Sequence, residues 1–372
     1  MKQLMRYPTV GAALLISALA LTACGSSEGG DGAGATSSSG IDVAQASKSL
    51  EAVVGGSGEI SLPPIDKPIP TGKTVNYITC PVAVCTQVGD GVKAAAAVLG
   101  WNVKVIPNDY TPAGYTEAWK QIAQDPGDGV INASAALPYS AVKQQVDEAN
   151  VPIVGSTSPD PVGGKLLAVV SSEKDIHLQG EVEANWVIQD AKEPVKSVYV
   201  YDPQISALRS AWPGYQDAMK KNCPACEVES LEVQAAQIGP ALAQQVVSYL
   251  QANPDVKYVA FGLGDLAIGV PAALKASGLQ DQVKLTTRAA GPSNFEDVES
   301  GGMSAAFTAE LYEAGWRTVD LMARTFTDTP IDDPYPLGVI RMITKDNLPS
   351  DITVPYSLPD YEAVFKTAWG VS

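Results

Sequence analysis

Short apolar runs alternate with amphipathic segments along most of this chain. From Lys73 onward, runs such as residues 75–78 indicate buried strands, because they are short, apolar and bounded by turn residues. Between them lie segments of about ten to fifteen residues with helical spacing, as at 87–99, which ends at a glycine. Strands that alternate with such helices predict a parallel sheet with helices on both faces.

This pattern occurs twice in succession. The first set comprises strands at 75–78, 101–106, 129–133, 151–155 and 166–170, with helices at 87–99, 115–124 and 138–150. The second comprises strands at 197–201, 228–233, 258–261, 283–287 and 304–307, with helices at 175–189, 206–221, 240–252, 267–277, 295–300 and 310–325. The break lies near 171–174. We therefore predict an α/β fold of two Rossmann-like lobes with parallel sheets.

A ligand site is expected where the two predicted sheets face each other. In open parallel sheets, ligands bind beyond the carboxyl ends of the strands. The loops at those ends are 80–87, 134–139, 156–160, 202–209, 263–265 and 288–293.

The first residues have the pattern of a secretory signal. Lys2 and Arg6 precede an apolar run at 10–21, which is shorter than the roughly 20 residues of a membrane-spanning helix. The sequence Leu-Thr-Ala-Cys at 21–24 looks like the bacterial lipobox. We predict a signal peptide at 1–23, lipidation of Cys24 and a location on the extracytoplasmic face of the cell membrane. An ordinary signal peptide is the alternative.

Residues 24–72 read as a flexible tether rich in Gly, Ser and Pro. The segment 25–40 has no aliphatic side chain larger than alanine, so it cannot bury enough surface to offset the entropy of ordering. One short helix is expected near 43–53, ahead of a proline-rich stretch that ends at Pro70.

Composition narrows the function classes. The formal net charge is −16, from 41 acidic and 25 basic residues. No basic patch is present, which argues against nucleic acid and against adsorption to anionic lipid. After the signal and tether, about 300 residues remain, enough for two domains of ordinary size.

Four cysteines besides Cys24 fall in two local pairs. In an exported chain such pairs predict the disulfides Cys80–Cys85 and Cys223–Cys226. A four-cysteine zinc site is the competing interpretation, but no histidine lies near either pair. A redox-active CPAC motif at 223–226 is also weakly supported, because it follows a helix rather than opening one.

Catalytic motifs are absent from the sequence. His177 is the sole histidine, so a triad of the Ser-His-Asp kind would have to use it. We predict no catalytic residue, no cofactor and no metal site. An exported enzyme that depends on His177 is kept as a hypothesis.

Several segments, taken in order, resemble the ribose-type (type I) solute-binding proteins of ABC importers. They include GDGVKAAAAVLGWNVKV at 89–105, HLQGEVEANWV at 177–187, ALRSAWPGYQDAM at 207–219 and GGMSAAFTAELYEAGWRTVDLM at 301–322. The resemblance implies a hinge of three crossings between the lobes, closure on a small molecule, and delivery to a membrane permease. It also implies a monomer, with the first lobe at 73–173 plus about 311–340 and the second at 174–310 plus about 341–372.

The resemblance suggests ligand-binding positions and shows departures from the family. Arg209 matches the family's ligand-contacting arginine, whereas Ala290 and Glu310 stand where the family has an aspartate and a glutamine. The residues expected to bind ligand are Val82, Val84, Ser156, Thr157, Arg209, Leu263, Asp265, Arg288, Ala290 and Glu310.

These departures remove polar partners that a sugar needs, since a buried hydroxyl left unpaired costs about 1–3 kcal/mol. We therefore expect a sugar-like or, better, a less hydroxylated aromatic or anionic metabolite, with Arg209 or Arg288 on its charge. The alternative function is a ligand-sensing subunit of a membrane signalling protein.

Overall fold

The computed structural model describes residues 40–54, 60–134, 137–331, 340–353, 358 and 360–371. All of them belong to one compact unit. The predicted signal peptide and Cys24 lie outside the described residues. Within those residues, no helix combines the length and apolar character that crossing a membrane requires.

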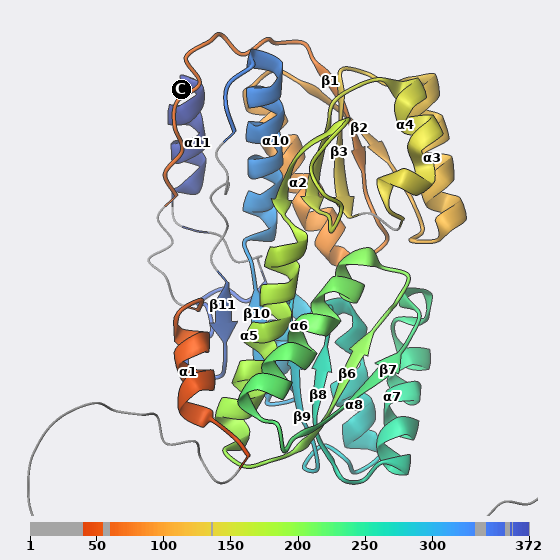
Figure 1. Ribbon diagram of the computed structural model, residues 1–372, viewed down its shortest axis with the longest axis vertical. Coiled ribbons are helices and arrows are strands. Elements are labelled where there is room, and N and C mark those ends of the chain that lie inside the picture. The colour runs from red at the N-terminus through yellow and green to blue at the C-terminus, as the bar shows by residue number, and fades with distance from the viewer. Residues whose placement is uncertain are drawn as a thin grey trace, which may run out of the picture. The chain divides into compact units, whose positions relative to one another are not determined.

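The first sheet has five parallel strands in the order β2-β1-β3-β4-β5. Their bounds are β1 Thr74–Ile78, β2 Asn102–Ile106, β3 Gly129–Ser134, β4 Ile153–Thr157 and β5 Leu166–Ser171. The helices are α2 Ala83–Val98, α3 Pro112–Gln124, α4 Lys143–Ala149 and α10 Leu311–Thr327, with a short 3₁₀ turn, η1, at Tyr139–Val142. Helices α2 and α10 lie on one face and α3 and α4 on the other (Figure 1). Every residue of β3 is buried, as expected for a central strand covered on both faces.

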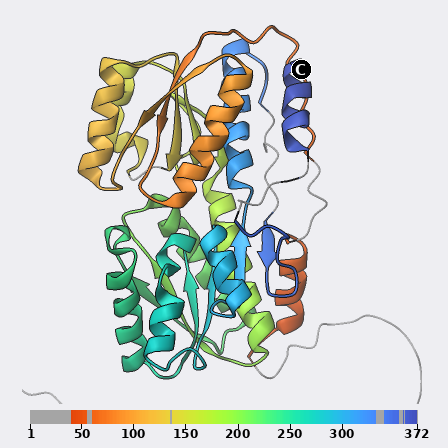
Figure 2. The same cartoon turned by 180° about the vertical axis from the view of Figure 1, so that it is seen from behind.

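The second sheet has six strands in the order β11-β10-β9-β8-β6-β7, all parallel except β11, which runs antiparallel to β10. The strands are β6 Lys196–Tyr201, β7 Glu227–Glu232, β8 Val256–Phe261, β9 Lys284–Thr287, β10 Ala305–Thr308 and β11 Arg341–Ile343. The helices are α5 Glu173–Ala191, α6 Ser206–Asn222, α7 Pro240–Ala252, α8 Val270–Ala276 and α9 Pro292–Ser300, and the 3₁₀ turns are η2 Ala235–Gln237 and η3 Gly264–Ala267. Helices α5 and α6 cover one face, and α7 and α8 the other (Figure 2).

The predicted α/β fold of two Rossmann-like lobes with parallel sheets is confirmed. Several helices differ from their predicted bounds, among them α3, which begins at Pro112 rather than at 115, and the helix expected at 138–150, which is divided into η1 and α4. Helix α2 begins at Ala83 rather than at 87, and the helix expected at 267–277 is divided into η3 and α8. The division falls at Gly269, whose φ of +81° is left-handed and so interrupts the helix.

The two ends of the described chain pack differently from the prediction. Helix α1, Val43–Glu51, occurs where a short helix was expected, but it packs on α5 and α6 rather than belonging to a free tether (Figure 1). Helix α10 packs against the first sheet, and β11 joins the second. Helix α11, Tyr361–Trp369, lies beside α10 (Figure 2), whereas the prediction placed 341–372 with the second lobe.

Aromatic stacking accounts for the position of α11. The rings of Trp369 and Trp316 stack with centroids 5.5 Å apart, and Phe365 packs on the same Trp316 ring. The proline-rich segment that ends at Pro70 contacts the end of α11, because the Ile65 N–H donates to the Ala368 carbonyl at 2.7 Å. The other lobe limits stay a prediction.

Both predicted disulfides are present. Cys80 is bonded to Cys85 at the start of α2, and Cys223 to Cys226 just after α6. The CPAC cysteines therefore close a small loop after a helix, as the sequence position indicated.

Glycines bring the paired helices of each lobe into backbone contact. A Cβ added at Gly180 of α5 would lie 2.1 Å from the Ala211 carbonyl oxygen, and one at Gly214 of α6 would lie 2.0 Å from the His177 oxygen. In the first lobe, Gly91 of α2 faces α10 in the same way, 1.9 Å from the Tyr312 oxygen. Because the obstructing atoms are backbone, only separation of the helices could make room.

We expect Gly180→Ala to lower the free energy of unfolding by about 1–3 kcal/mol, the usual cost of overpacking. This loss should appear although alanine is favoured over glycine in a helix by about 1 kcal/mol. Urea unfolding followed by circular dichroism measures it. Gln216→Ala on the exposed face of α6 is the control and should change stability by less than about 0.5 kcal/mol. Equal stabilities of Gly180→Ala and wild type would contradict the close-contact interpretation.

Candidate functional site

The strands of both sheets direct their carboxyl ends toward one cavity. Its lining comes from the last residues of, or the segments after, β1, β2, β3, β4 and β5 of the first sheet and β6, β8, β9 and β10 of the second. The cavity volume is about 140 Å³, below the roughly 300–1,000 Å³ typical of pockets for drug-sized ligands. The cavity therefore suits a small molecule.

Most of the wall is aliphatic. The apolar lining residues include Val84, Val88, Val170, Leu178, Ile205, Leu208, Leu263, Phe307 and Leu311. The polar side chains on the wall are fewer and include Tyr110, Ser134, Ser156, Thr157, Gln179 and Thr308. Such a wall favours a ligand with substantial apolar surface, because each buried ligand hydroxyl needs a partner.

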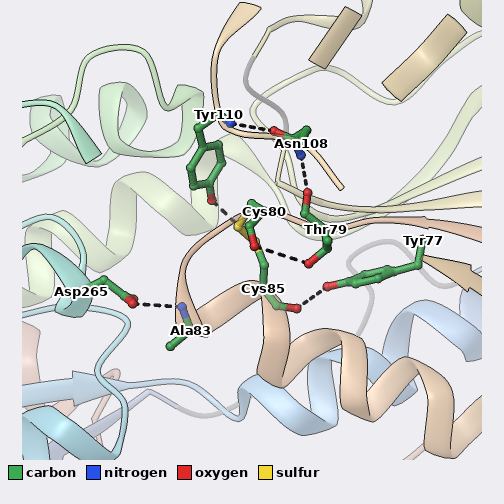
Figure 3. The surroundings of a disulfide bond; sticks show 8 residues. All are labelled: Tyr77, Thr79, Cys80, Ala83, Cys85, Asn108, Tyr110 and Asp265. Atoms are coloured by element: carbon green, nitrogen blue, oxygen red, sulfur yellow. Dashed lines mark hydrogen bonds between the residues drawn. A yellow bond between two sulfur atoms is a disulfide. The ribbon is translucent and has the colours of Figure 1, made fainter. Parts of the chain in front are cut away.

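A disulfide and its neighbours fix the loop that enters the cavity from β1 (Figure 3). Cys85 lines the cavity, and its carbonyl accepts a hydrogen bond from the Tyr77 hydroxyl at 2.5 Å. The Tyr110 hydroxyl lies 3.6 Å from the Cys85 sulfur, and burial raises the pKa of this hydroxyl. Asn108 connects the segment after β1 with the segment after β2. Its side chain donates to the Thr79 carbonyl and accepts from the Tyr110 N–H. This part of the wall is therefore rigidly supported.

Asp265 makes a hydrogen bond from the second lobe to the first (Figure 3). Its carboxylate accepts from the Ala83 N–H at 2.9 Å, in the first turn of α2. The helix has no capping side chain of its own, because Val82 occupies the N-cap position. Burial raises the pKa of the Asp265 carboxyl, and the bond from Ala83 opposes the rise. Asp265 thus acts as a helix cap supplied by the opposite lobe.

Arg288 lies on the cavity wall, but its donors face the protein. Its Nε and Nη2 donate to the Gln179 side-chain oxygen at 3.1 and 2.5 Å, and Nη1 donates to the Gly262 carbonyl at 2.7 Å. Behind it, burial raises the pKa of the Glu183 carboxyl, and the charge of Arg288 opposes that rise. The guanidinium is therefore used to hold α5 against the second sheet.

Glu310 is the N-cap residue of α10 and lies on the cavity wall. It is 2 % exposed, and neither carboxylate oxygen accepts a hydrogen bond from the part of the chain that the structure describes. Burial raises its pKa to about 7, and the neighbouring Glu313 adds to the rise. Arg317, two turns further along α10, also lines the cavity and is paired with Glu313.

The structure brings most of the predicted ligand-binding positions to this cavity. On its wall are Val84, Ser156, Thr157, Leu263, Arg288 and Glu310, and off it are Val82, Arg209, Asp265 and Ala290. Arg209 was the expected contact for a ligand charge, but it is exposed and donates to the Pro203 carbonyl at 3.1 Å. Because a helix turns about 100° per residue, the preceding Leu208 faces the cavity instead.

Sequence reasoning missed several wall residues, among them Tyr110, Gln179, Phe307 and Arg317. Ser134 directly ends a buried strand and was included only as the first residue of the predicted loop 134–139. No signal existed for Gln179 or Arg317, because they are ordinary polar positions within long helices.

His177 does not line the cavity. Its Nε2 lies 3.5 Å from a Glu181 carboxylate oxygen and 3.4 Å from one of Asp217, on the outer surface where α5 meets α6. Among the residues that the structure describes, no group of three or more His, Cys, Asp or Glu side chains could hold a metal ion.

Comparison with known proteins agrees with this architecture. The sequence profile of the family described as "Periplasmic binding protein domain" matches residues 82–328. No curated protein matches the sequence. Two solved structures with similar folds are sugar complexes of solute-binding proteins. One, an ABC transporter solute-binding protein from Agrobacterium vitis bound with α-D-tagatopyranose, has a TM-score of 0.67 and 18 % identity, covering 77 % of this chain and 100 % of its own.

The other is a 5-methylthioribose transporter solute-binding protein from Thermotoga lettingae, in complex with that ligand. Its TM-score is 0.67 at 15 % identity, covering 83 % of this chain and 95 % of its own. A glucose-galactose binding protein from Geobacillus stearothermophilus has a TM-score of 0.65 at 18 % identity, covering 75 % and 100 %. At these identities the likeness establishes the fold.

Proposed function

The chain belongs to the periplasmic binding protein family, and on that premise we propose that it captures a small solute in the cavity between its lobes for an ABC importer. The observation that carries the proposal is the cavity itself, where the strand ends of both sheets meet. Ligand-binding sites of parallel sheets occupy this position. Structural neighbours described as ABC transporter solute-binding proteins support import rather than signalling.

The proposed ligand is sugar-like but only partly hydroxylated. The largely aliphatic wall supports an apolar portion, and a neighbour that binds 5-methylthioribose, a sugar with a thioether, supports the same combination. The anionic ligand expected from the sequence loses its basis, because Arg209 is exposed and the Arg288 donors are engaged within the protein. A ligand with an aromatic ring remains compatible with the apolar wall, so the binding screen below includes an aromatic compound.

We further propose that the chain acts as a monomer, without catalysis, on the outer face of the cell membrane. The proposed location rests on the lipobox-like sequence that ends at Cys24 and on the apolar run before it. A diacylglycerol mass on the N-terminal peptide of the mature protein would support it. An unmodified cysteine, or cleavage at another position, would contradict the anchor and leave the binding proposal intact.

A thermal-shift screen tests the binding proposal. The panel contains 5-methylthioribose, D-fucose, D-ribose and benzoate. A true ligand at a hundredfold excess over its Kd should stabilise the fold by about 2.7 kcal/mol. Ala207→Phe, which fills the cavity from the first turn of α6, should abolish that shift.

Ala276→Phe, at an exposed position of α8, is the matched control and should keep the shift. Equal shifts in both variants would place the ligand outside the cavity and contradict the proposal. A shift with benzoate alone would overturn the sugar-like ligand.

A further inference from the structure

Glu310 is an unusual residue for an apolar wall. It lies between β10 and α10, where the chain passes from the second sheet to the first lobe. It is 2 % exposed, and both its oxygens are without a hydrogen-bond donor among the described residues. A buried polar group left unpaired costs about 1–3 kcal/mol, and more when it is charged. A group held in this state at a ligand cavity indicates that the ligand supplies the partner.

The charged groups around Glu310 leave its carboxylate oxygens able to accept hydrogen bonds from a ligand. On α10, Glu313 accepts a hydrogen bond from the Arg317 guanidinium, and both are buried. From β11, which is antiparallel to β10, the charge of Arg341 acts on Glu310 together with that of Arg317. These cations favour the ionised carboxylate without a hydrogen bond to it, so its oxygens remain free to accept.

We propose that Glu310 accepts two hydrogen bonds from one end of the ligand, supplied by a pair of adjacent hydroxyls or by a protonated amine. This inference rests on the proposed function. An ionised carboxylate only accepts hydrogen bonds, so this end of the ligand must be a donor, while the rest contacts the aliphatic wall. The ligand class is therefore an amphiphilic molecule with a vicinal diol or an ammonium group at one end.

The titration of Glu310 gives the inference a second consequence. Donors on the ligand stabilise the ionised form. Since burial and Glu313 raise the pKa of the free protein's Glu310 to about 7, ligand binding near neutral pH should release a proton. Affinity should therefore increase as the pH rises through about 7. The charged groups that act on this carboxylate are Glu313, Arg317 and Arg341.

Three probes with the same six-membered carbon ring separate the possibilities. They are cis-1,2-cyclohexanediol, cyclohexylamine and cyclohexanol, with binding to the full mature chain measured by calorimetry. The expected result is that the diol or the amine binds at least about tenfold more tightly than cyclohexanol, the equivalent of about 1.4 kcal/mol. A preference for the diol identifies hydroxyl donors, and a preference for the amine identifies a cationic ligand.

Glu310→Gln should reduce that preference at least about tenfold and remove its pH dependence, because an amide offers only one accepting oxygen. Glu117→Gln on the exposed surface of α3 is the matched control and should behave as wild type. Equal preference in wild type and Glu310→Gln would overturn the inference. If 5-methylthioribose or D-fucose binds while the preference is unaltered, the proposed function stands and only this inference fails.

A measurement without ligand keeps the inference testable in every case. A glutamate whose pKa is raised on folding contributes stability below its unfolded pKa and loses it as the pH rises toward the folded value. Glu310→Gln should therefore melt at a higher temperature than wild type at pH 8, with the difference disappearing toward pH 5. A difference that does not vary with pH would mean that Glu310 is not an unpartnered buried carboxylate, and would overturn the inference.

Discussion

Asp320→Ala is expected to lower the free energy of unfolding by about 3–5 kcal/mol, the usual cost of removing one partner from a buried ion pair. The Asp320 carboxylate is fully buried on α10 and accepts from Arg324 Nε at 2.7 Å. Its other oxygen accepts from the Trp369 indole N–H at 2.8 Å, which fixes α11. Arg324 in turn donates to the Pro63 carbonyl at 2.7 Å. One carboxylate thus holds the C-terminal helix and the proline-rich segment on the first lobe.

Urea unfolding, with tryptophan fluorescence as a second probe, measures this loss. Asp147→Ala is the control, because Asp147 forms an (i, i+4) pair with Lys143 on the exposed surface of the same lobe. Pairs of that kind contribute less than about 1 kcal/mol. If the two variants lose similar stability, the buried network does not hold α11, and the position of α11 beside α10 would need another explanation.

Arg288→Met is the second change with a large expected effect, a loss of at least about 3 kcal/mol. The variant leaves Glu183, which is completely buried, without the neighbouring positive charge that favours its ionised form. It also leaves the Gln179 side-chain oxygen and the Gly262 carbonyl without their donors. Because the pKa of Glu183 then rises further, the stability deficit relative to wild type should grow as the pH increases.

The double variant Glu183→Gln with Arg288→Met tests this explanation. It should recover part of the lost stability and show a deficit that no longer grows between pH 5 and pH 8. If the deficit of Arg288→Met were independent of pH, Glu183 would not be the group that Arg288 compensates. If Arg288→Met were as stable as wild type but bound none of the ligands, Arg288 would contact the ligand, as the sequence had suggested.

The position of the cavity was predictable from the sequence, and the roles of its charged residues were not. The loops after the strands were identified because strand ends are a local property, and Ser156, Thr157 and Leu263 do line the cavity. Arg209 and Arg288 were both assigned to a ligand charge. Their side chains point to Pro203 and to Gln179, and those contacts depend on how α5 and α6 lie against the second sheet.

Asp265 shows the same limit. It is in the predicted segment, but its carboxylate caps α2 in the opposite lobe, 182 residues away along the chain. Helix capping by a neighbouring Ser, Thr, Asp or Asn leaves a mark in the sequence, as at Thr111, which caps α3. Capping from another lobe leaves none. Glycine contacts such as that of Gly180 with α6 are hidden for the same reason.

By itself, the sequence of this protein determined the order and type of its elements, the two-lobed parallel architecture, the local disulfides and the edge of the sheets where the cavity lies. Each follows from patterns within a few residues, such as hydrophobic period, turn residues and cysteine spacing. Only the tertiary structure decided that α11 packs beside α10 and that Arg288 donates to Gln179 and lies near enough to Glu183 to favour its ionised form. The same holds for Glu310, which is buried without a hydrogen-bond donor among the described residues. Those outcomes depend on packing between distant segments, and local patterns carry no information about which distant side chains meet.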